Sequence, residues 1–394
     1  MIGGGDNGLM SLSAVAVIGA GPGGLAAAAM LKQQGVAAIV FEREASVGAS
    51  WRSRYDRLHL HTTRSLSDLP GLRFPRDVGR WVSRDDVVAY LDRYAERFEL
   101  DVLLETGVER IDRRDGRWLL RTTRGDRKAG DVVVATGYAR LPFLPDWEGR
   151  QRFAADFVHS AFYRNPSPYR GREVLVVGTG NSGAEIAVDL VEGGARRVLL
   201  SVRTPPQIFP RQALGVPAQA IGICIRRLPP SVGDAVGVIL QRAFVGDLSR
   251  HGMPRAGHRP YSEFLGRHAI PILDIGLIRL LKHHAVEVIP AVEAFERSAV
   301  LLADGTRVTP DAVIAATGYR CGLEPLVGHL GVLDDDGRPL VNGASTHPSA
   351  PRLHFIGFAN PISGNLREIA IDARKIARAI SSSAAVPERA TVVP

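Results

Sequence analysis

The sequence predicts an α/β fold made of two units, each with a mostly parallel sheet and helices packed against it. Three observations predict this fold. Short apolar segments typical of buried strands alternate with helical patterns along the chain. Two glycine-rich turns each follow such a segment and open a helix. The length of 394 residues exceeds that of one ordinary domain.

The first glycine-rich turn contains Gly19, Gly21 and Gly24 and lies between the apolar segment 15–18 and an alanine-rich helix. This pattern is typical of a dinucleotide-binding, Rossmann-like unit, because the glycines let the backbone approach a pyrophosphate that rests on a helix N-terminus. Glu42 follows the next predicted strand. Its carboxylate can accept hydrogen bonds from ribose hydroxyls and would repel a 2′-phosphate, so this turn is predicted to bind FAD.

The second glycine-rich turn contains Gly178, Gly180 and Gly183 and has the same context, after the apolar segment 174–177. Arg203 follows the next predicted strand. A guanidinium at this point suits a 2′-phosphate, which predicts NADPH at the second turn, with NADH as the alternative. Two such turns in one chain predict that one protein holds two dinucleotides.

Local patterns predict the elements between and after these turns. Ser83 with Asp86 three residues later indicates the start of an amphipathic helix. Asp-Gly turns flanked by strand patterns indicate two hairpins. In chain order, the predicted elements are a helix over 83–98, a hairpin over 102–123, a helical cover over a pocket within 213–245, a hairpin over 300–309 and a helix over 366–380.

Two buried strands lead into the same Ala-Thr-Gly sequence, with Thr136 and Gly137 in the first copy and Gly318 in the second. A buried strand that ends in a glycine turn is typical of a strand passing close to a nucleotide. The proline-rich passage 141–168 between the units is predicted to be a linker or crossover.

These elements predict that the NADPH domain is inserted into the FAD domain. The FAD-binding domain is expected to comprise residues 1–165 and to resume over 290–394. The NADPH-binding domain is expected to comprise residues 166–289.

Composition excludes several other classes of protein. The formal charge of +8 comes from arginines scattered among acidic residues, without a basic block or an aromatic platform, so nucleic-acid binding is not predicted. The two cysteines are far apart and form no Cys-x-x-Cys, so the redox dithiol of related reductases is absent. No metal-ligand spacing occurs, and no apolar run approaches the ~20 residues of a membrane span. A cytoplasmic enzyme without a transmembrane segment is expected.

Longer motifs resemble those of one enzyme family. The sequence ahead of the second glycine turn contains Phe153, Ala155, His159 and Tyr163 in the spacing that identifies flavin-containing monooxygenases, with alanine in place of the usual glycine. Three segments resemble the plant YUCCA-type members of that family: 51–61, 180–186 and 271–276. Thr63 stands where these relatives usually have proline. The resemblance covers about Val15 to about Ile380.

The resemblance implies FAD and NADPH as cofactors and a set of residues that contact them. His61, in the loop that faces the flavin, and Asn181, at the start of the second helix, are the implied catalytic residues. His159 is expected to order the connection between the domains. Beyond the turn residues, Glu42 and Arg203, the implied cofactor contacts are Trp51, Leu60, His61, Val108, Thr136, Gly137, Asn181, Ser182, Thr204, Gly318 and Gly357.

The resemblance also implies a reaction. NADPH reduces FAD, the reduced flavin reacts with O₂ to give a C4a-(hydro)peroxide, and one oxygen atom passes to a small organic substrate. YUCCA-type enzymes act on indole-3-pyruvate, so an aromatic 2-oxo acid is the expected substrate class. Two alternatives remain: an N- or S-oxygenating member of the same family, and an NADPH-dependent FAD reductase that inserts no oxygen. A homodimer is an open alternative to a monomer.

Overall fold

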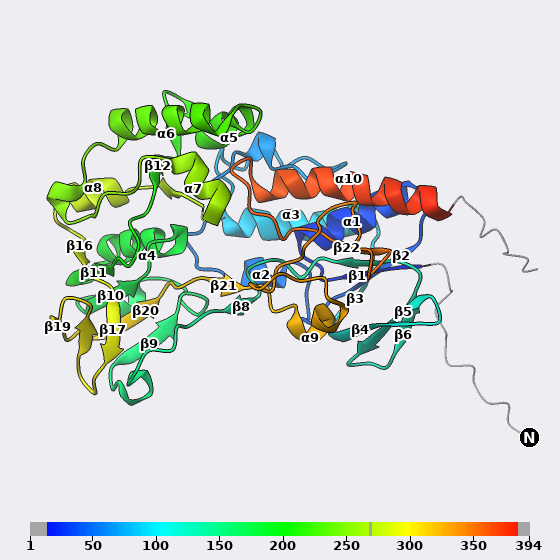
Figure 1. The fold of residues 1–394 in the computed structure, drawn as a ribbon, viewed down its shortest axis with the longest axis horizontal. Coiled ribbons are helices and arrows are strands. Elements are labelled where there is room, and N and C mark those ends of the chain that lie inside the picture. The colour runs from blue at the N-terminus through cyan, green and yellow to red at the C-terminus, as the bar shows by residue number, and fades with distance from the viewer. Residues whose placement is uncertain (1–13, 268–269, 385–394) are drawn as a thin grey trace, which may run out of the picture.

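The computed structural model describes residues 14–267 and 270–384. It contains two five-stranded sheets that lie side by side, with most helices above them and the two three-stranded antiparallel sheets below them in the view of Figure 1. The predicted α/β fold is confirmed, and each glycine-rich turn follows the central strand of its own sheet.

All strands of the first sheet are parallel. Its innermost strands are buried on both faces, which explains why they appear in the sequence as continuous apolar runs rather than as alternating patterns. The strand order is β22 (Leu353–Phe355), β7 (Val132–Val134), β1 (Val15–Ile18), β2 (Ala38–Phe41) and β3 (Asp101–Leu103).

Three helices cover the first sheet on one side (Figure 1). They are α1 (Pro22–Gln33), α3 (Arg84–Arg97) and α10 (Asn365–Ala384). The alanines of α1 are buried, and their small side chains allow α10 to pack closely against it. The predicted start of α3 is confirmed, because the Ser83 hydroxyl accepts a hydrogen bond from the backbone N–H of Asp86.

An antiparallel sheet flanks the first unit on the other side. The predicted turn at Asp115 and Gly116 is confirmed, since both residues have positive φ values of 52° and 76°, as tight hairpin turns require. The sheet consists of β4 (Val108–Arg114), β5 (Arg117–Thr122) and β6 (Arg127–Ala129). The short helices α2 (Ala49–Arg52) and α9 (Glu324–Val327) belong to the same unit.

The second sheet repeats the arrangement of the first. The strand before the second glycine turn lies at its centre, and all pairs are parallel. Its order is β16 (Glu287–Ile289), β11 (Arg197–Ser201), β10 (Glu173–Val177), β20 (Ala312–Ala315) and β9 (Asp156–His159). Helices α4 (Asn181–Glu192) and α8 (Leu277–Lys282) pack on it.

Strand pairing in the second sheet crosses the domain boundaries expected at 165 and 290. Both β9 and β20 lie outside 166–289 yet pair within this sheet. The proline-rich passage 141–168, predicted to be a linker or crossover, therefore contains a strand of the second sheet, β9. Each Ala-Thr-Gly strand pairs with the strand of its own glycine turn, β7 with β1 and β20 with β10. The pairing therefore follows this internal repeat, because two buried parallel strands must lie side by side to satisfy their backbone hydrogen bonds.

A small antiparallel sheet covers the lower face of the second unit and confirms the predicted hairpin over 300–309. It contains β17 (Val292–Phe295), β18 (Val300–Leu302) and β19 (Arg307–Val308). Phe295 packs against Trp147, Phe153 and Phe157 with ring centroids 5.2–5.6 Å apart. The aromatic start of the motif that precedes the second turn is therefore part of a core.

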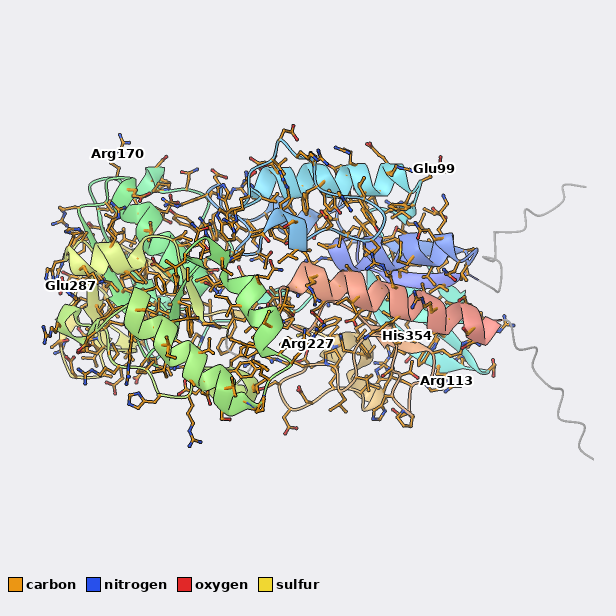
Figure 2. All side chains as sticks on the ribbon, turned by 90° about the horizontal axis from the view of Figure 1, so that it is seen from above. Glu99, Arg113, Arg170, Arg227, Glu287 and His354 are labelled. Atoms are coloured by element: carbon orange, nitrogen blue, oxygen red, sulfur yellow. The ribbon has the colours of Figure 1, made fainter. Side chains whose placement is uncertain are left out.

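The predicted helical cover lies on the second unit and reaches the first turn of α10, as Figure 2 shows from above. Arg226 and Glu368 form an ion pair there at 2.7 Å. The cover contains α5 (Ala218–Ile225), α6 (Pro230–Phe244) and α7 (Pro260–Arg267), with β12 (Ile208–Pro210) paired to β15 (Ile272–Asp274) and β13 (Gln212–Ala213) paired to β14 (Val216–Pro217). Within the described ranges, every helix is too short or too polar to cross a membrane.

We predict that Gly149→Ala destabilises the fold more than Gly171→Ala. Both glycines have a left-handed backbone, with φ of 73° and 72°. A Cβ at Gly149 would lie 1.8 Å from the Phe295 carbonyl oxygen, whereas a Cβ at Gly171 meets nothing within 4 Å. The control should cost about 1–2 kcal/mol from backbone strain, and Gly149→Ala a further ~1–3 kcal/mol from overlap. Equal losses in denaturant unfolding would show that the β17 contact does not constrain the fold.

Candidate functional site: two glycine turns and one cavity

The two glycine turns have matching backbone geometry. Gly19 and Gly178 have φ values of 103° and 110°, which side-chain-bearing residues rarely adopt. A Cβ at either position would also collide with the strand beside it, 2.9 Å from the Ala135 carbonyl oxygen in one unit and 2.6 Å from that of Ala316 in the other. Glycine is therefore required at the first position of both turns.

The last glycine of each turn brings the helix close to the strand end. A Cβ at Gly24 would lie 1.8 Å from the Gly19 carbonyl oxygen, and one at Gly183 would lie 2.0 Å from that of Gly178. Such contacts leave no room for any side chain. They hold the N-termini of α1 and α4 directly above their turns, where free N–H groups favour an anion.

The middle glycine of each turn borders open space. A Cβ at Gly21 or at Gly180 would meet no atom within 4 Å. Packing within the protein therefore does not require glycine at either position. Close by, the Thr136 hydroxyl is buried and has no hydrogen-bond partner among the described residues. The open space beside Gly21 and Gly180, at the N-termini of α1 and α4, has room for a pyrophosphate at each turn. Together with the unpaired Thr136 hydroxyl, these spaces fit the two dinucleotides that the sequence implies.

Glu42 and Arg203 occupy equivalent places at the ends of β2 and β11 but differ in environment. The Glu42 carboxylate is buried and fixed by backbone N–H groups, at 2.7 Å from Ala20 and 3.0 Å from Glu44. It can still accept bonds from hydroxyls on its remaining lone pairs. Arg203 and Thr204 are exposed, and no described residue pairs with the Arg203 guanidinium. Its charge is available to a bound anion.

A cavity of about 1410 Å³ is lined by residues of both units and of the cover. This volume exceeds that of a typical single-ligand pocket. Of the predicted site residues, the cavity brings together Gly19, Gly21, Glu42, Trp51, Leu60, His61, Val108, Thr136, Gly137, Asn181, Ser182 and Gly357. The remaining ones do not line it: Gly24, Gly178, Gly180, Gly183, Arg203, Thr204 and Gly318.

The cover supplies an apolar end to this cavity. Its lining side chains include Ile221, Ile225, Leu240, Tyr261 and Phe264. Small residues hold the cover helices together, because a Cβ on Gly233 or Gly237 of α6 would come within 2.4 Å of Tyr261 or 2.6 Å of Pro260. The prediction of a helical pocket cover is confirmed.

Gln219 fastens the cover to the first unit. Its side chain is 1% exposed. The amide oxygen accepts a hydrogen bond from the Thr63 backbone N–H at 3.0 Å, and the amide nitrogen donates to the carbonyl oxygens of Leu66 and Ser363 at 3.2 and 2.9 Å. Proline at position 63 could not donate this bond. The departure from the relatives' usual proline therefore has a structural role here.

His61 lies on the cavity wall, with its Nε2 atom 2.5 Å from Oε1 of Glu185. Glu185 belongs to α4, and its other carboxylate oxygen accepts a hydrogen bond from the Tyr55 hydroxyl at 2.9 Å. Burial, and then the charge of Glu185, raise the pKa of Tyr55 well above its usual value, so the phenol stays protonated. The loop of the first unit that carries Tyr55 and His61 is thus in contact with α4, the helix that follows the second glycine turn.

Asn181 is held by the cover. Its amide nitrogen donates to the Pro271 carbonyl oxygen at 3.2 Å, and its amide oxygen accepts from the Leu273 backbone N–H at 2.9 Å. These bonds fix β15 beside the second turn. The side chain still lines the cavity, as does Ser182, and the catalytic assignment of Asn181 stays a prediction.

His159 orders the connection between the units, as expected from the sequence. Its Nδ1 accepts a hydrogen bond from the Ala161 backbone N–H at 3.0 Å, and its Nε2 donates to the Gly318 carbonyl oxygen at 3.1 Å. Burial lowers the pKa of His159, which favours this neutral form. The contact fixes the second Ala-Thr-Gly turn and places Gly318 in a structural role.

Sequence reasoning did not assign roles to Tyr55, Glu185 or Gln219. Two signals were available. Glu185 and Asp189 are acidic residues within an otherwise apolar helix, and Gln219 is a polar residue within an apolar segment. Buried polar side chains of this kind need partners, so each indicates a contact with another element.

Comparisons with known proteins show which family this chain resembles over most of its length. A family described as pyridine nucleotide-disulphide oxidoreductase matches residues 16–211. The indole-3-pyruvate monooxygenase YUCCA8 of Oryza sativa subsp. indica is 35% identical over 382 residues, which covers 91% of this chain and 89% of the relative. The indole-3-pyruvate monooxygenase YUCCA1 of Oryza sativa subsp. japonica is 36% identical over 311 residues, covering 77% and 76%.

Solved structures share the fold. The flavin-containing monooxygenase from Stenotrophomonas maltophilia superposes with a TM-score of 0.71 at 24% identity, covering 94% of this chain and 98% of that one. Closed cyclohexanone monooxygenase has a TM-score of 0.72 at 18% identity, covering 95% and 85%. The turns, the cavity and the extent of the sequence identity lead to one conclusion. The chain belongs to the flavin-containing monooxygenase family, among the YUCCA-type enzymes, and as such binds FAD and uses NADPH.

Proposed function

We propose that this monooxygenase inserts one atom of O₂ into an aromatic 2-oxo acid of the indole-3-pyruvate kind, which then loses CO₂. The observation that carries the proposal is 35% identity over 89% of a relative named for that substrate. In balance, the 2-oxo acid, O₂, NADPH and a proton give the carboxylic acid one carbon shorter, CO₂, water and NADP⁺. We further propose that the enzyme acts in the cytoplasm, as a monomer or homodimer.

In this assignment, FAD lies on the first turn and NADPH on the second. Gly21 would leave room for the FAD pyrophosphate, Glu42 would accept bonds from its ribose, and Arg203 would pair with the 2′-phosphate of NADPH. The flavin, reduced by NADPH, supplies the activated oxygen. The chain's own residues position the reactants and exclude water.

The apolar end of the cavity supports an aromatic substrate. Side chains such as Leu240 and Phe264 from the cover can enclose a ring, while His61 and Asn181 add polar groups to the lining of the same cavity. Bonds from Gln219 to the first unit hold the cover over this end, where we expect it to exclude water around a bound substrate. Water exclusion strengthens polar interactions with the reacting groups.

We expect Gly21→Val to fold without FAD. Gly21 has φ −80° and ψ −175°, an extended backbone that valine adopts, and a Cβ there meets no protein atom within 4 Å. The valine would instead occupy the pyrophosphate's place. Gly180→Val is the matched variant, with φ −81° and ψ 178°, and should keep FAD while NADPH binding weakens. Flavin absorbance per folded chain and flavin reduction at increasing NADPH measure the two effects. A folded, yellow Gly21→Val protein would refute the assignment.

Arg203→Ala is expected to lower kcat/KM for NADPH by ~10- to 150-fold, because a charge-assisted bond to the 2′-phosphate contributes about 1.5–3 kcal/mol. The value for NADH, which lacks this phosphate, should change little. Stopped-flow reduction of the flavin by each nucleotide provides the measurement. A parallel fall with both nucleotides would mean that Arg203 supports the fold of the second unit rather than reading the phosphate.

Oxygen transfer is tested with ¹⁸O₂. We expect one ¹⁸O atom in the carboxylic acid formed from indole-3-pyruvate, and little product from a tertiary amine or a thioether. Efficient sulfoxidation without decarboxylation would select the N- or S-oxygenating alternative. NADPH oxidation that yields only H₂O₂ with every substrate would select the reductase.

His61→Ala should leave flavin reduction by NADPH nearly intact, since hydride transfer needs only the stacked nicotinamide and flavin. Loss of one hydrogen bond at the oxygen-transfer step should raise the ratio of H₂O₂ to product by ~2- to 12-fold. NADPH, H₂O₂ and product are measured in one assay, with His258→Ala, an exposed histidine, as the control. Unchanged coupling would remove His61 from the reaction.

A further inference from the structure

The carboxylate of Glu185 is enclosed by two side chains of the loop that carries His61. It is 2% exposed and lies one helical turn after Asn181 on α4. Its Oε1 lies 2.5 Å from His61 Nε2, and its Oε2 accepts the Tyr55 hydroxyl. Unlike His61 and Tyr55, Glu185 does not line the cavity. It can therefore act on the cavity only through those two side chains.

The ring nitrogens of His61 are in unequal positions. Both are buried, although the side chain as a whole is 20% exposed. Nε2 faces the Glu185 carboxylate at ion-pair distance, although the two atoms do not meet the angle of a hydrogen bond. Nδ1 has no hydrogen-bond partner among the described residues. Since buried polar atoms are normally paired, Nδ1 is open to a group bound in the cavity.

The chemistry of the pair fixes which nitrogen carries hydrogen. A carboxylate only accepts hydrogen bonds, and a neutral imidazole has one N–H donor and one accepting nitrogen. A hydrogen bond between these two groups therefore requires that the nitrogen beside Glu185 be the donor. Tyr55, whose hydroxyl binds the other oxygen, keeps the carboxylate from turning away.

We propose that Glu185 is a positioning residue that holds the proton of His61 on Nε2 and so makes Nδ1 a proton-accepting nitrogen at the cavity wall. This inference rests on the proposed function for its consequence. An oxygen atom that attacks a carbonyl carbon as a nucleophile must be free of its proton, and an accepting Nδ1 is suited to hold that proton. A donating nitrogen would not serve this step.

Other charges near the cluster do not replace Glu185. Arg54 lies on the Tyr55 side, and Arg211 and Asp274 lie on the cover side. The Arg211 guanidinium is over the Trp81 ring at 4.3 Å, and its pKa is lowered, chiefly by burial. No ion pair joins His61 to any of these three within the described ranges.

The next turn of α4 provides a matched control. Asp189 is also a buried acid that accepts a tyrosine hydroxyl, from Tyr163 at 2.7 Å, and it lies 3.6 Å from Arg57. It does not contact His61, and it does not line the cavity. If the two acid–tyrosine pairs on α4 had only a structural role, replacing Glu185 and Tyr55 would affect His61 no more than replacing Asp189 and Tyr163.

The test reads the two ring nitrogens of His61 by ¹⁵N NMR in the FAD-loaded protein labelled at its 11 histidines. The His61 signals are identified by their absence in His61→Ala. The variants are Glu185→Leu with Tyr55→Phe and, as control, Asp189→Leu with Tyr163→Phe. Each variant replaces both partners of its acid–tyrosine bond, so neither of these two groups is left buried without the other, and both proteins should fold.

We expect hydrogen on Nε2 in the native protein and in the Asp189 control, and loss of that preference in the Glu185 variant. Hydrogen on Nδ1 in the native protein, or an unchanged His61 in the Glu185 variant, would overturn the proposal. This result is independent of turnover. Failure of the proposed function would appear instead as a native protein that forms no acid from any 2-oxo acid.

The second readout is the coupling of NADPH oxidation to product formation, measured as the ratio of H₂O₂ to product. The Glu185 variant should raise the ratio of H₂O₂ to product by the same ~2- to 12-fold as His61→Ala. Added to His61→Ala, it should change the ratio by less than about 2-fold, because residues that act through one another are not additive. Fully additive effects, or a changed tautomer with native coupling, would overturn a role through His61.

Discussion

The polar face of α4 is the constraint on which both units depend. Asn181, Glu185 and Asp189 recur every four residues and so share one face. Each is paired, with the backbone of β15, with Tyr55 and His61, and with Tyr163 respectively. Buried polar groups are costly unless paired, so the loop of the first unit and the helix of the second have few alternative positions.

The polar face of α4 joins the second glycine turn to the cavity wall at His61. The helix that offers its N-terminal N–H groups at the second turn also holds the side chain on the cavity wall, because Glu185 comes two residues after Gly183. A shift of α4 at either end would be felt at the other. Helix α4 thereby connects the second glycine turn to the position of His61.

Local chemistry explains what could be predicted from the sequence. The glycine turns, the Ser83 cap and the Asp-Gly hairpins each depend on a few neighbouring residues, and the structure contains all of them. Glu42 and Thr136 each follow a strand that a short apolar run predicts, and the structure places both on the cavity wall, where their contact with a cofactor stays a prediction. The pairing of β20 with β10 follows the Ala-Thr-Gly repeat, whereas the membership of β9 in the second sheet depends on pairing with a distant strand, which no short pattern encodes.

The polar contacts that were missed are also long-range. The bonds of Gln219 join positions 63, 66, 219 and 363, and those of Glu185 join positions 55, 61 and 185. A sequence can indicate that a buried polar side chain needs a partner, but only the packing of the cover and the two units identifies it. The motif residues Phe153, His159 and Tyr163 likewise proved to be core and connecting residues.

The connection between the units has a further consequence. The chain leaves the first unit through β8 (Leu141–Pro142) and returns through β21 (Tyr319–Arg320), and these two strands pair side by side in antiparallel fashion. The two chain connections between the first and the second unit thus lie next to each other. An exchange of the second unit together with its cover would therefore cut the chain at two points that are neighbours in space, and the incoming unit would have to present an acidic helix face to the loop that carries His61.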